Sequence, residues 1–237
     1  MMGYSHAVTG AAVWCAVAAP TGIIHGTGAT AVAGYVAGAL VSAGAALLPD
    51  LDHRGATIAR ALPPVTTLLS VLIGALSGGH RKGTHSMVGI VAFTLAAWAS
   101  ALWEITVSGT VYHPGPAIGA VVMVSLAMKV LRLGDRPAVS WFASLGAGLL
   151  ILLTADPHSA SWFPVAIAIG VATHILGDML TVNGVPLLWP FTTKPLRLPV
   201  LGTTGSVLEK VLVGLSAVSI VFTAMWAMPT LLAASTA

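Results

Sequence analysis

The sequence predicts an all-α integral membrane protein, a single helical bundle over residues 1–237 with about seven membrane spans and one re-entrant or interfacial helix. Hydrophobic residues fill 57% of the positions and charged residues only 7%, against roughly 25% charged in ordinary soluble domains. So few charges cannot cover a soluble globule, and so apolar a chain is not disordered. Aromatic residues make up only 6%, so small and aliphatic residues dominate, as in closely packed membrane helices.

Cysteine content and charge exclude further classes of protein. The single cysteine, Cys15, rules out an internal disulfide and a cysteine-rich zinc site, and we expect it to be buried. The net charge is only +3 despite a pI of 9.4, which indicates basic cytoplasmic loops, and no nucleic-acid binding is predicted. No Lys or Arg precedes the apolar stretch at 7–19, so we interpret it as a helix of the mature protein.

Seven apolar stretches approach the roughly 20 residues that a membrane-spanning helix needs. In chain order they are 5–20, 29–48, 86–108, 116–132, 138–154, 162–181 and 207–228. A further stretch, 64–78, has only about 15 residues between Pro63-Pro64 and Gly78-Gly79. We expect this stretch to be re-entrant or interfacial.

The basic residues set the predicted orientation. If 64–78 does not cross, all 10 Lys and Arg residues lie on the side of the N-terminus. The opposite connections, near 21–28, 109–115 and 155–161, carry none. By the positive-inside rule the chain is a multi-pass protein of the inner (cytoplasmic) membrane with its N-terminus in the cytoplasm and its C-terminus outside. A crossing at 64–78 would divide the basic residues between the two faces.

The same topology gathers acidic residues and histidines at the cytoplasmic face. They are His6 at the start of the first span, Asp50 and Asp52 at the end of the second, His80 and His85 before the third, and His174 and Asp178 in the last turns of the sixth. Ionisable groups in spans are costly and mark functional sites. The last two are four residues apart and share a helix face.

These residue types predict a shared site for a divalent metal ion. Imidazole and carboxylate together suit zinc, which we expect, and several carboxylates also admit manganese or magnesium. Asp50 and Asp52 would repel each other unless a cation or a proton lay between them. Each piece also has a structural interpretation: the two aspartates as a helix-ending turn, His174 with Asp178 as a neutral pair bridging helices, and Thr84-His85-Ser86 as an N-cap. His25, His113 and His158 are predicted surface residues.

Residues near the predicted metal site suggest how an anion would bind. Arg81 and Lys82 lie between two candidate ligands, and a cation beside a metal commonly holds a phosphate or carboxylate. The alternative is anchoring at the membrane interface. The long connection from Thr181 to Gly205, which includes Asn183, either covers the site or is an interfacial loop anchored by Trp189.

Four segments resemble the YdjM family, over about residues 1–191 and in the family's order. They are His6, LLPDLDH at 47–53, HRKGTHS at 80–86 and HILGDMLTVNGVPLLWPF at 174–191. Members are described as membrane-bound, metal-dependent hydrolases, in some bacteria under LexA control. The resemblance implies metal binding by His6, Asp50 or Asp52, His85, His174 and Asp178, with His80 and Arg81 nearby.

The element at 174–178 is also similar to one in zinc-dependent phospholipase C and P1-type nucleases, which cut phosphodiesters with a zinc cluster. Asn183 and Gly184 stand where those enzymes continue with a second histidine.

The resulting hypothesis is a metal-dependent hydrolase at the cytoplasmic membrane interface, acting on a phosphoester or lipid-linked substrate by metal-activated water. The candidate general base is a spare carboxylate of the pair Asp50 and Asp52, or His80. Arg81, Lys82 and Asn183 are the candidate substrate-binding residues. Two alternatives remain: a metal-ion or proton-coupled transporter, and a non-catalytic membrane protein in which a metal only joins helices.

Overall fold

A computed structural model describes residues 1–24, 28–60, 64–133, 137–153 and 161–233, and within them the chain is mostly helical. The α-helices are α1 (Gly3–Ala18), α2 (Gly28–Ala45), α3 (Val65–Leu76), α4 (Met87–Ala101), α5 (Pro114–Leu131), α6 (Pro137–Leu153), α7 (Trp162–Met179) and α8 (Val207–Ala233). Three 3-10 helices lie between them, η1 (Leu48–Asp52), η2 (Ile58–Arg60) and η3 (Gly83–His85). The described part is therefore mostly helical, as predicted, but a two-stranded sheet departs from the predicted all-α class.

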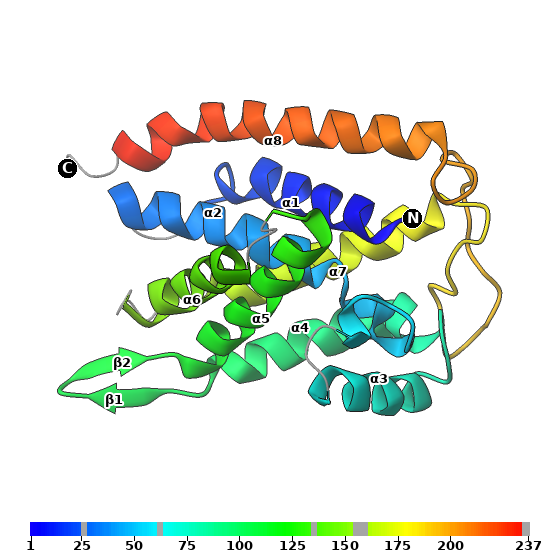
Figure 1. Ribbon diagram of the computed structural model, residues 1–237, viewed down its shortest axis with the longest axis horizontal. Helices are drawn as coiled ribbons and strands as arrows, with labels where there is room; N and C mark the ends of the chain where they lie inside the picture. Colours follow the sequence, from blue (N-terminus) through cyan, green and yellow to red (C-terminus); the bar gives the residue numbers. More distant parts are fainter. Residues whose placement is uncertain (25–27, 61–63, 134–136, 154–160, 234–237) are drawn as a thin grey trace.

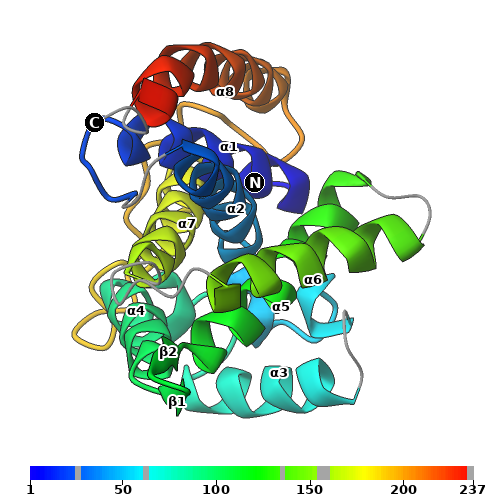
Figure 2. The same cartoon turned by 90° about the vertical axis from the view of Figure 1, so that its left-hand side faces the viewer.

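The helices pack around α1, α2 and α7, which contact one another. Helix α8 packs on α1 and α2, the pair α5–α6 packs on α2, and α4 packs on α7. Both views place α8 along one edge of the bundle and α3 along the opposite edge (Figures 1 and 2). The N-terminus and the connection from α7 to α8 lie at one end, and the last turns of α8 lie at the other (Figure 1).

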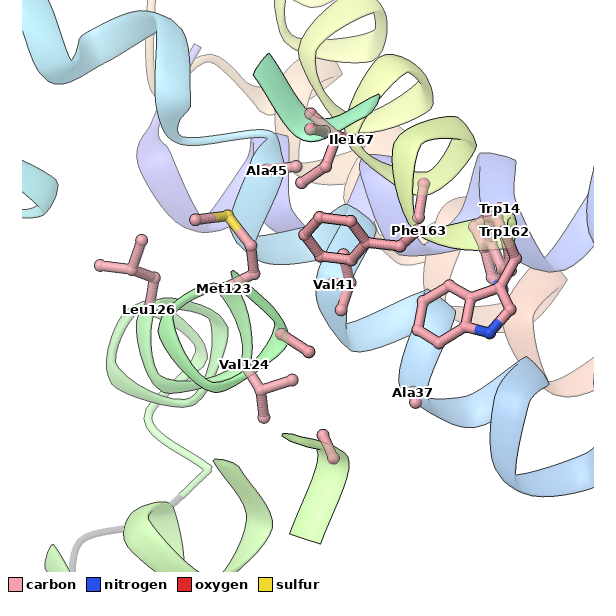
Figure 3. Close-up of a cluster of buried hydrophobic side chains, with 14 of the residues drawn as sticks. Trp14, Ala37, Val41, Ala45, Met123, Val124, Leu126, Trp162, Phe163 and Ile167 are labelled. Carbon is pink, nitrogen blue, oxygen red and sulfur yellow. The ribbon is translucent and has the colours of Figure 1, made fainter. Parts of the chain in front are cut away.

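A continuous apolar core joins α1, α2, α5 and α7 (Figure 3). Trp14 is fully buried there, and its indole N–H donates to the carbonyl of Tyr35 at 2.9 Å. The hydroxyl of Tyr35 in turn donates to the carbonyl of Cys15. Cys15 is 3% exposed, which confirms its predicted burial. Small residues bring helices into backbone contact: a Cβ on Gly44 of α2 would lie 2.0 Å from the carbonyl oxygen of Met123 in α5.

The structure does not support the predicted count of seven spans. Within the described residues, four segments are long and apolar enough to cross a membrane: Gly28–Asp52, Pro114–Leu131, Trp162–Met179 and Val207–Leu232. The other three predicted spans form the shorter helices α1, α4 and α6, of 16, 15 and 17 residues. Helix α4 ends well before the predicted end of its span, whereas α1 and α6 have the predicted lengths but are shorter than the roughly 20 residues that a span needs.

The span predicted at 86–108 was wrong in a specific way. Helix α4 ends at Ala101, and the chain then forms an antiparallel hairpin of β1 (Ile105–Val107) and β2 (Thr110–Tyr112). The turn residues Ser108 and Gly109 both have positive φ, 52° and 82°, which matches the twist that a two-residue hairpin loop requires.

The segment predicted as re-entrant or interfacial contains α3, only 12 residues long. At 1.5 Å per residue this helix measures about 18 Å, well short of a hydrocarbon core of about 30 Å. It packs against η1 and η2 and exposes Leu68, Leu72 and Leu76 on its outer face. A short helix with an apolar outer face is consistent with the non-spanning role expected for it.

Candidate metal centre

Four elements deliver the predicted ligands to one end of the bundle. His6 lies in the first turns of α1, and His174 and Asp178 lie in the last turns of α7. Asp50 is held in η1, directly after α2, and His85 in η3, directly before α4. All five side chains converge because helices that run in opposite directions begin or end at this level.

Two imidazoles and two carboxylates form the centre of the cluster. The Nε2 atoms of His85 and His174 lie 3.3 Å apart. Asp50 Oδ1 lies 3.6 Å from Nε2 of His85 and 3.9 Å from that of His174. Asp178 Oδ2 lies 3.9 Å and 3.8 Å from the same two nitrogens. The two histidine side chains and that of Asp178 are at most 2% exposed, so the cluster is shielded from bulk water.

Hydrogen bonds fix the tautomer of both central histidines. His174 Nδ1 lies 2.7 Å from the carbonyl oxygen of Ala46, and because a carbonyl only accepts, this nitrogen carries the proton. Thr84 donates its hydroxyl to Asp52 Oδ2 at 2.6 Å, so its oxygen accepts from His85 Nδ1–H at 3.0 Å. When both rings are neutral, each therefore directs an Nε2 lone pair into the cluster, which is the arrangement that metal-binding histidines adopt.

His6 extends the cluster on the side of α1. Its ring stacks on His174 with centroids 3.7 Å apart, and its Nε2 lies 3.2 Å from Asp178 Oδ1. The same carboxylate oxygen forms an ion pair with the amino group of Met1. Arg81 contacts the second oxygen of Asp178 at 3.4 Å. Asp178 is therefore the carboxylate that ties α1, α7 and the 80–86 segment together.

Asp52 lies behind His85 and contacts it only through Nδ1, at 3.5 Å. Its Oδ1 bonds His80 Nδ1 at 2.7 Å, and its Oδ2 accepts from Thr84 and from the backbone N–H of Arg81. These contacts make Asp52 the partner that orients His80 and His85. Asp50 and Asp52 flank Leu51 but have different surroundings, because Asp50 faces the two central Nε2 atoms and Asp52 faces His80 and Thr84.

The charge state of His85 follows from these contacts. Burial alone would lower the pKa of its imidazole, but hydrogen bonds to Asp50 and Asp52 and the charges of both carboxylates outweigh burial. The net effect raises the pKa of His85 to about 9. In the metal-free chain the imidazole of His85 is therefore protonated near neutral pH, and the carboxylates of Asp50 and Asp52 stabilise its charge.

The donor atoms fit a divalent cation. Two groups of described residues each bring three donor atoms within 4.8 Å of one another: His6, His174 and Asp178, and Asp50, His85 and His174. Two nitrogens bound to one tetrahedral zinc ion at about 2.0–2.1 Å lie about 3.3 Å apart, which is the separation of the two central Nε2 atoms. In addition, His6 Nδ1 is buried without a hydrogen-bond partner, so the protein alone does not satisfy the cluster.

The predicted substrate-binding residues share a pocket next to His80. Arg81, Lys82 and Asn183 line this cavity of about 490 Å³ together with residues of the connection from α7 to α8. That connection lies over the 77–86 segment: the N–H of Met87 donates to the carbonyl of Leu187, and the ring of Trp189 lies against Gly83. The long connection therefore packs on the segment that carries His80 and His85.

Some polar residues lie outside the expected pattern. Glu209, at the start of α8, is fully buried and accepts hydrogen bonds from Met2 N–H and Ser5 Oγ at 2.7 Å and 2.6 Å, anchoring α1. Glu209 was not predicted from the sequence, because a glutamate in the first turn of a helix is common for other reasons.

His113 was predicted to lie at the surface, but it is only 5% exposed, and its Nδ1 lies near the carbonyl of Ala101. His25 and His158 lie outside the described residues.

Comparisons with known proteins agree with the membrane character of the fold. The chain is 29% identical to "Uncharacterized protein YvsG" of Bacillus subtilis (strain 168) over 175 residues, which is 73% of this chain and 70% of the relative. No solved structure matches the chain. The family description "YdjM inner membrane protein" matches residues 1–237, the whole sequence, and the chain therefore belongs to the YdjM inner membrane protein family.

Proposed function

We propose that this protein is a membrane-bound, metal-dependent hydrolase that acts on a phosphoester or lipid-linked substrate at the cytoplasmic face of the membrane. The observation that carries the proposal is the pair of imidazole Nε2 atoms, of His85 and His174, that face each other at 3.3 Å between two carboxylates. Such a cluster inside an apolar bundle is costly without a cation to share.

A divalent metal held by His6, Asp50, His85, His174 and Asp178 would lower the pKa of a water molecule towards neutrality and polarise the scissile group. Zinc suits this mixture of imidazole and carboxylate best, with manganese or magnesium as alternatives. The remaining chemistry belongs to side chains around the cluster.

His80 is the proposed general base. Its Nδ1 lies 2.7 Å from Asp52 Oδ1, so Nδ1 carries the proton and Nε2 is left to accept one from water. The side chain is 39% exposed, whereas that of Asp52 is fully buried. An exposed imidazole oriented by a buried carboxylate is suited to proton transfer, and Asp52 acts as the positioning residue.

Arg81 and Lys82 are proposed to hold the anionic group of the substrate. Arg81 has a left-handed backbone, with φ of 56°, and its guanidinium reaches Asp178 while lining the pocket beside His80. Asn183 adds an amide to the same pocket. Basic residues around the cluster also support a cytoplasmic position for this end of the bundle.

The test is an assay for hydrolysis with protein purified in dodecyl maltoside and loaded with zinc or manganese. The substrates are phosphatidic acid, phosphatidylglycerol and an isoprenyl diphosphate, with release of phosphate or headgroup as the readout. We expect turnover of at least one class. His85→Ala should lose both metal and activity, and His80→Gln should keep the metal while kcat falls about 10²–10⁴-fold.

The matched control is His53→Gln, because His53 contacts the ring of His80 from outside the donor groups. This variant should keep both metal and activity. Metal-loaded wild-type protein that hydrolyses none of the three classes would contradict the proposal. Metal uptake into proteoliposomes under the same conditions would instead favour the transporter.

A further inference from the structure

A second cavity adjoins the candidate metal centre at Asp50. It has a volume of about 960 Å³ and lies between the start of α1, residues 47–58 and the end of α5. Asp50 lines this cavity, and its side chain is 29% exposed, whereas those of His85 and His174 are at most 1% exposed. Asp50 is therefore the ligand through which the cluster meets this cavity.

Two basic side chains line the cavity on the side of α5. Lys129 lies in the last turn of α5, and Arg132 caps the helix with a left-handed backbone, φ 52°. Both side chains are exposed, and in the part of the chain that the structure describes neither forms an ion pair. Asp50 is the one acidic residue among the described residues that line the cavity. Two cations against one carboxylate favour an anionic ligand.

The rest of the lining is largely apolar. Val8 of α1, Ile58 of η2 and Leu131 of α5 contribute aliphatic side chains. Binding a small hydrated anion would bury no apolar surface against these side chains, whereas binding a hydrocarbon chain would, with a favourable free energy. The pocket beside His80 lacks this combination, because its described lining has no large aliphatic side chain.

We propose that this cavity binds a phosphate-bearing amphiphile, with the phosphate held by Lys129 and Arg132 and the hydrocarbon chain along Val8, Ile58 and Leu131. The binding step stands on its own. It does not rest on the proposed function, in which Arg81 and Lys82 hold the hydrolysed group in the other pocket. Phospholipids and isoprenyl phosphates both carry this chemistry.

Binding is measured directly on full-length His85→Ala protein in dodecyl maltoside, so that turnover does not consume the ligand. The probes are farnesyl phosphate, dihexanoyl phosphatidic acid, farnesol and inorganic phosphate, titrated by calorimetry. We expect one of the two amphiphilic phosphates to bind at least about tenfold more tightly than farnesol or inorganic phosphate. Whichever binds better identifies the isoprenyl or the glycerolipid source.

Variants locate the site. Replacing both cations, Lys129→Gln with Arg132→Gln, should weaken binding of the preferred probe by about tenfold or more, because a charge-assisted contact is lost at each position. Lys210→Gln is the matched control, since it removes one exposed positive charge from α8, outside the cavity, and should change affinity less than about twofold. Val8→Trp should fill the apolar part and weaken the amphiphile but not inorganic phosphate.

Unchanged affinity in the double variant would overturn the proposal, and so would farnesol binding as tightly as farnesyl phosphate. Hydrolysis by wild-type protein with no effect of the double variant on binding would reject the cavity and leave the hydrolase intact. Binding that depends on the two cations, in a protein that hydrolyses nothing, would establish the cavity and reject the hydrolase.

Discussion

His85 and His174 face each other through their Nε2 atoms at 3.3 Å, while the Nδ1 proton of each ring points outward, to Thr84 and to the carbonyl of Ala46. Two lone pairs at that distance repel unless a cation lies between them. A proton meets this need in the metal-free chain, and a divalent metal meets it while also engaging Asp50 and Asp178.

Thr84→Val should weaken metal binding without removing a ligand. Its hydroxyl joins His85 Nδ1 to Asp52 Oδ2, so its loss frees the ring to rotate and leaves the buried Nδ1–H without this acceptor. Loss of such an outer partner typically costs about 10–100-fold in metal affinity. Competition with a fluorescent zinc chelator measures the change. Thr84→Ser keeps the hydroxyl and should stay near the wild-type affinity; equal weakening in both variants would argue against the relay.

Metal affinity should rise with pH. The pKa of His85 is raised to about 9, so below that value a metal must displace its proton. The apparent affinity should therefore rise by about tenfold per pH unit from near neutrality and level off above pH 9. Titrations in buffered zinc solutions between pH 6.5 and 9.5 measure this slope. A flat profile would mean that His85 does not exchange a proton for metal.

The same group makes a prediction for the metal-free protein. Because the folded-state pKa of His85 is raised, the protonated ring stabilises the fold fully below its ordinary value of about 6.5, and this contribution is lost as pH rises through about 9. The melting temperature in detergent with chelator present should fall over that window. His85→Gln cannot gain this proton, so its melting temperature should change less across the same range.

Glu209→Ala should destabilise the anchoring of α1 on α8. Its carboxylate accepts from Met2 N–H, Ser5 Oγ and Gly205 N–H inside the bundle. Leaving these donors unpaired should lower the free energy of unfolding by about 2–3 kcal/mol, measured by denaturant titration in mixed micelles. Glu104→Ala, a replacement of an exposed glutamate, serves as control and should change stability by less than about 0.5 kcal/mol. Equal stability of the two variants would exclude an anchoring role.

Gly44→Ala should separate α2 from α5. A Cβ at Gly44 would lie 2.0 Å from the carbonyl oxygen of Met123, and neither backbone can yield without moving a helix. We expect a loss of about 1–3 kcal/mol, as for overpacked cores. Gly146→Ala on α6 meets no atom within 4 Å and should be neutral or stabilising in the same thermal melts. A neutral Gly44→Ala would show that the helices are not in backbone contact.

The polar residues of the cluster could be predicted from sequence because they stand out against an apolar chain. His174 and Asp178 lie in one span and Asp50 lies at the end of another. Burying ionisable side chains in a bilayer costs free energy, so such residues indicate a functional site. Their convergence required only the order of helix ends along the chain. The separate roles of Asp50 and Asp52 could not be predicted, because they depend on which carboxylate faces His80 and Thr84 in the folded chain.

Helix length was the weakest part of the sequence prediction. An apolar window does not show where a helix stops, and Ala101 is followed by Leu102 and Trp103, which fit a span as well as a loop. The hairpin at 105–112 depends on the turn at Ser108 and Gly109, a signal that hydropathy ignores. The burial of Glu209 likewise depends on the packing of α8 against α1.

If one buried cluster holds a divalent metal, elemental analysis of detergent-purified protein will detect the bound ion. After exposure to zinc and gel filtration, the wild-type protein and His53→Ala should retain stoichiometric metal, because His53 lies outside the donor groups. His85→Ala and the double variant His174→Ala/Asp178→Ala should retain none while eluting as folded protein. Wild-type protein that binds neither zinc nor manganese, or equal metal in all four proteins, would show that this cluster is not a metal site.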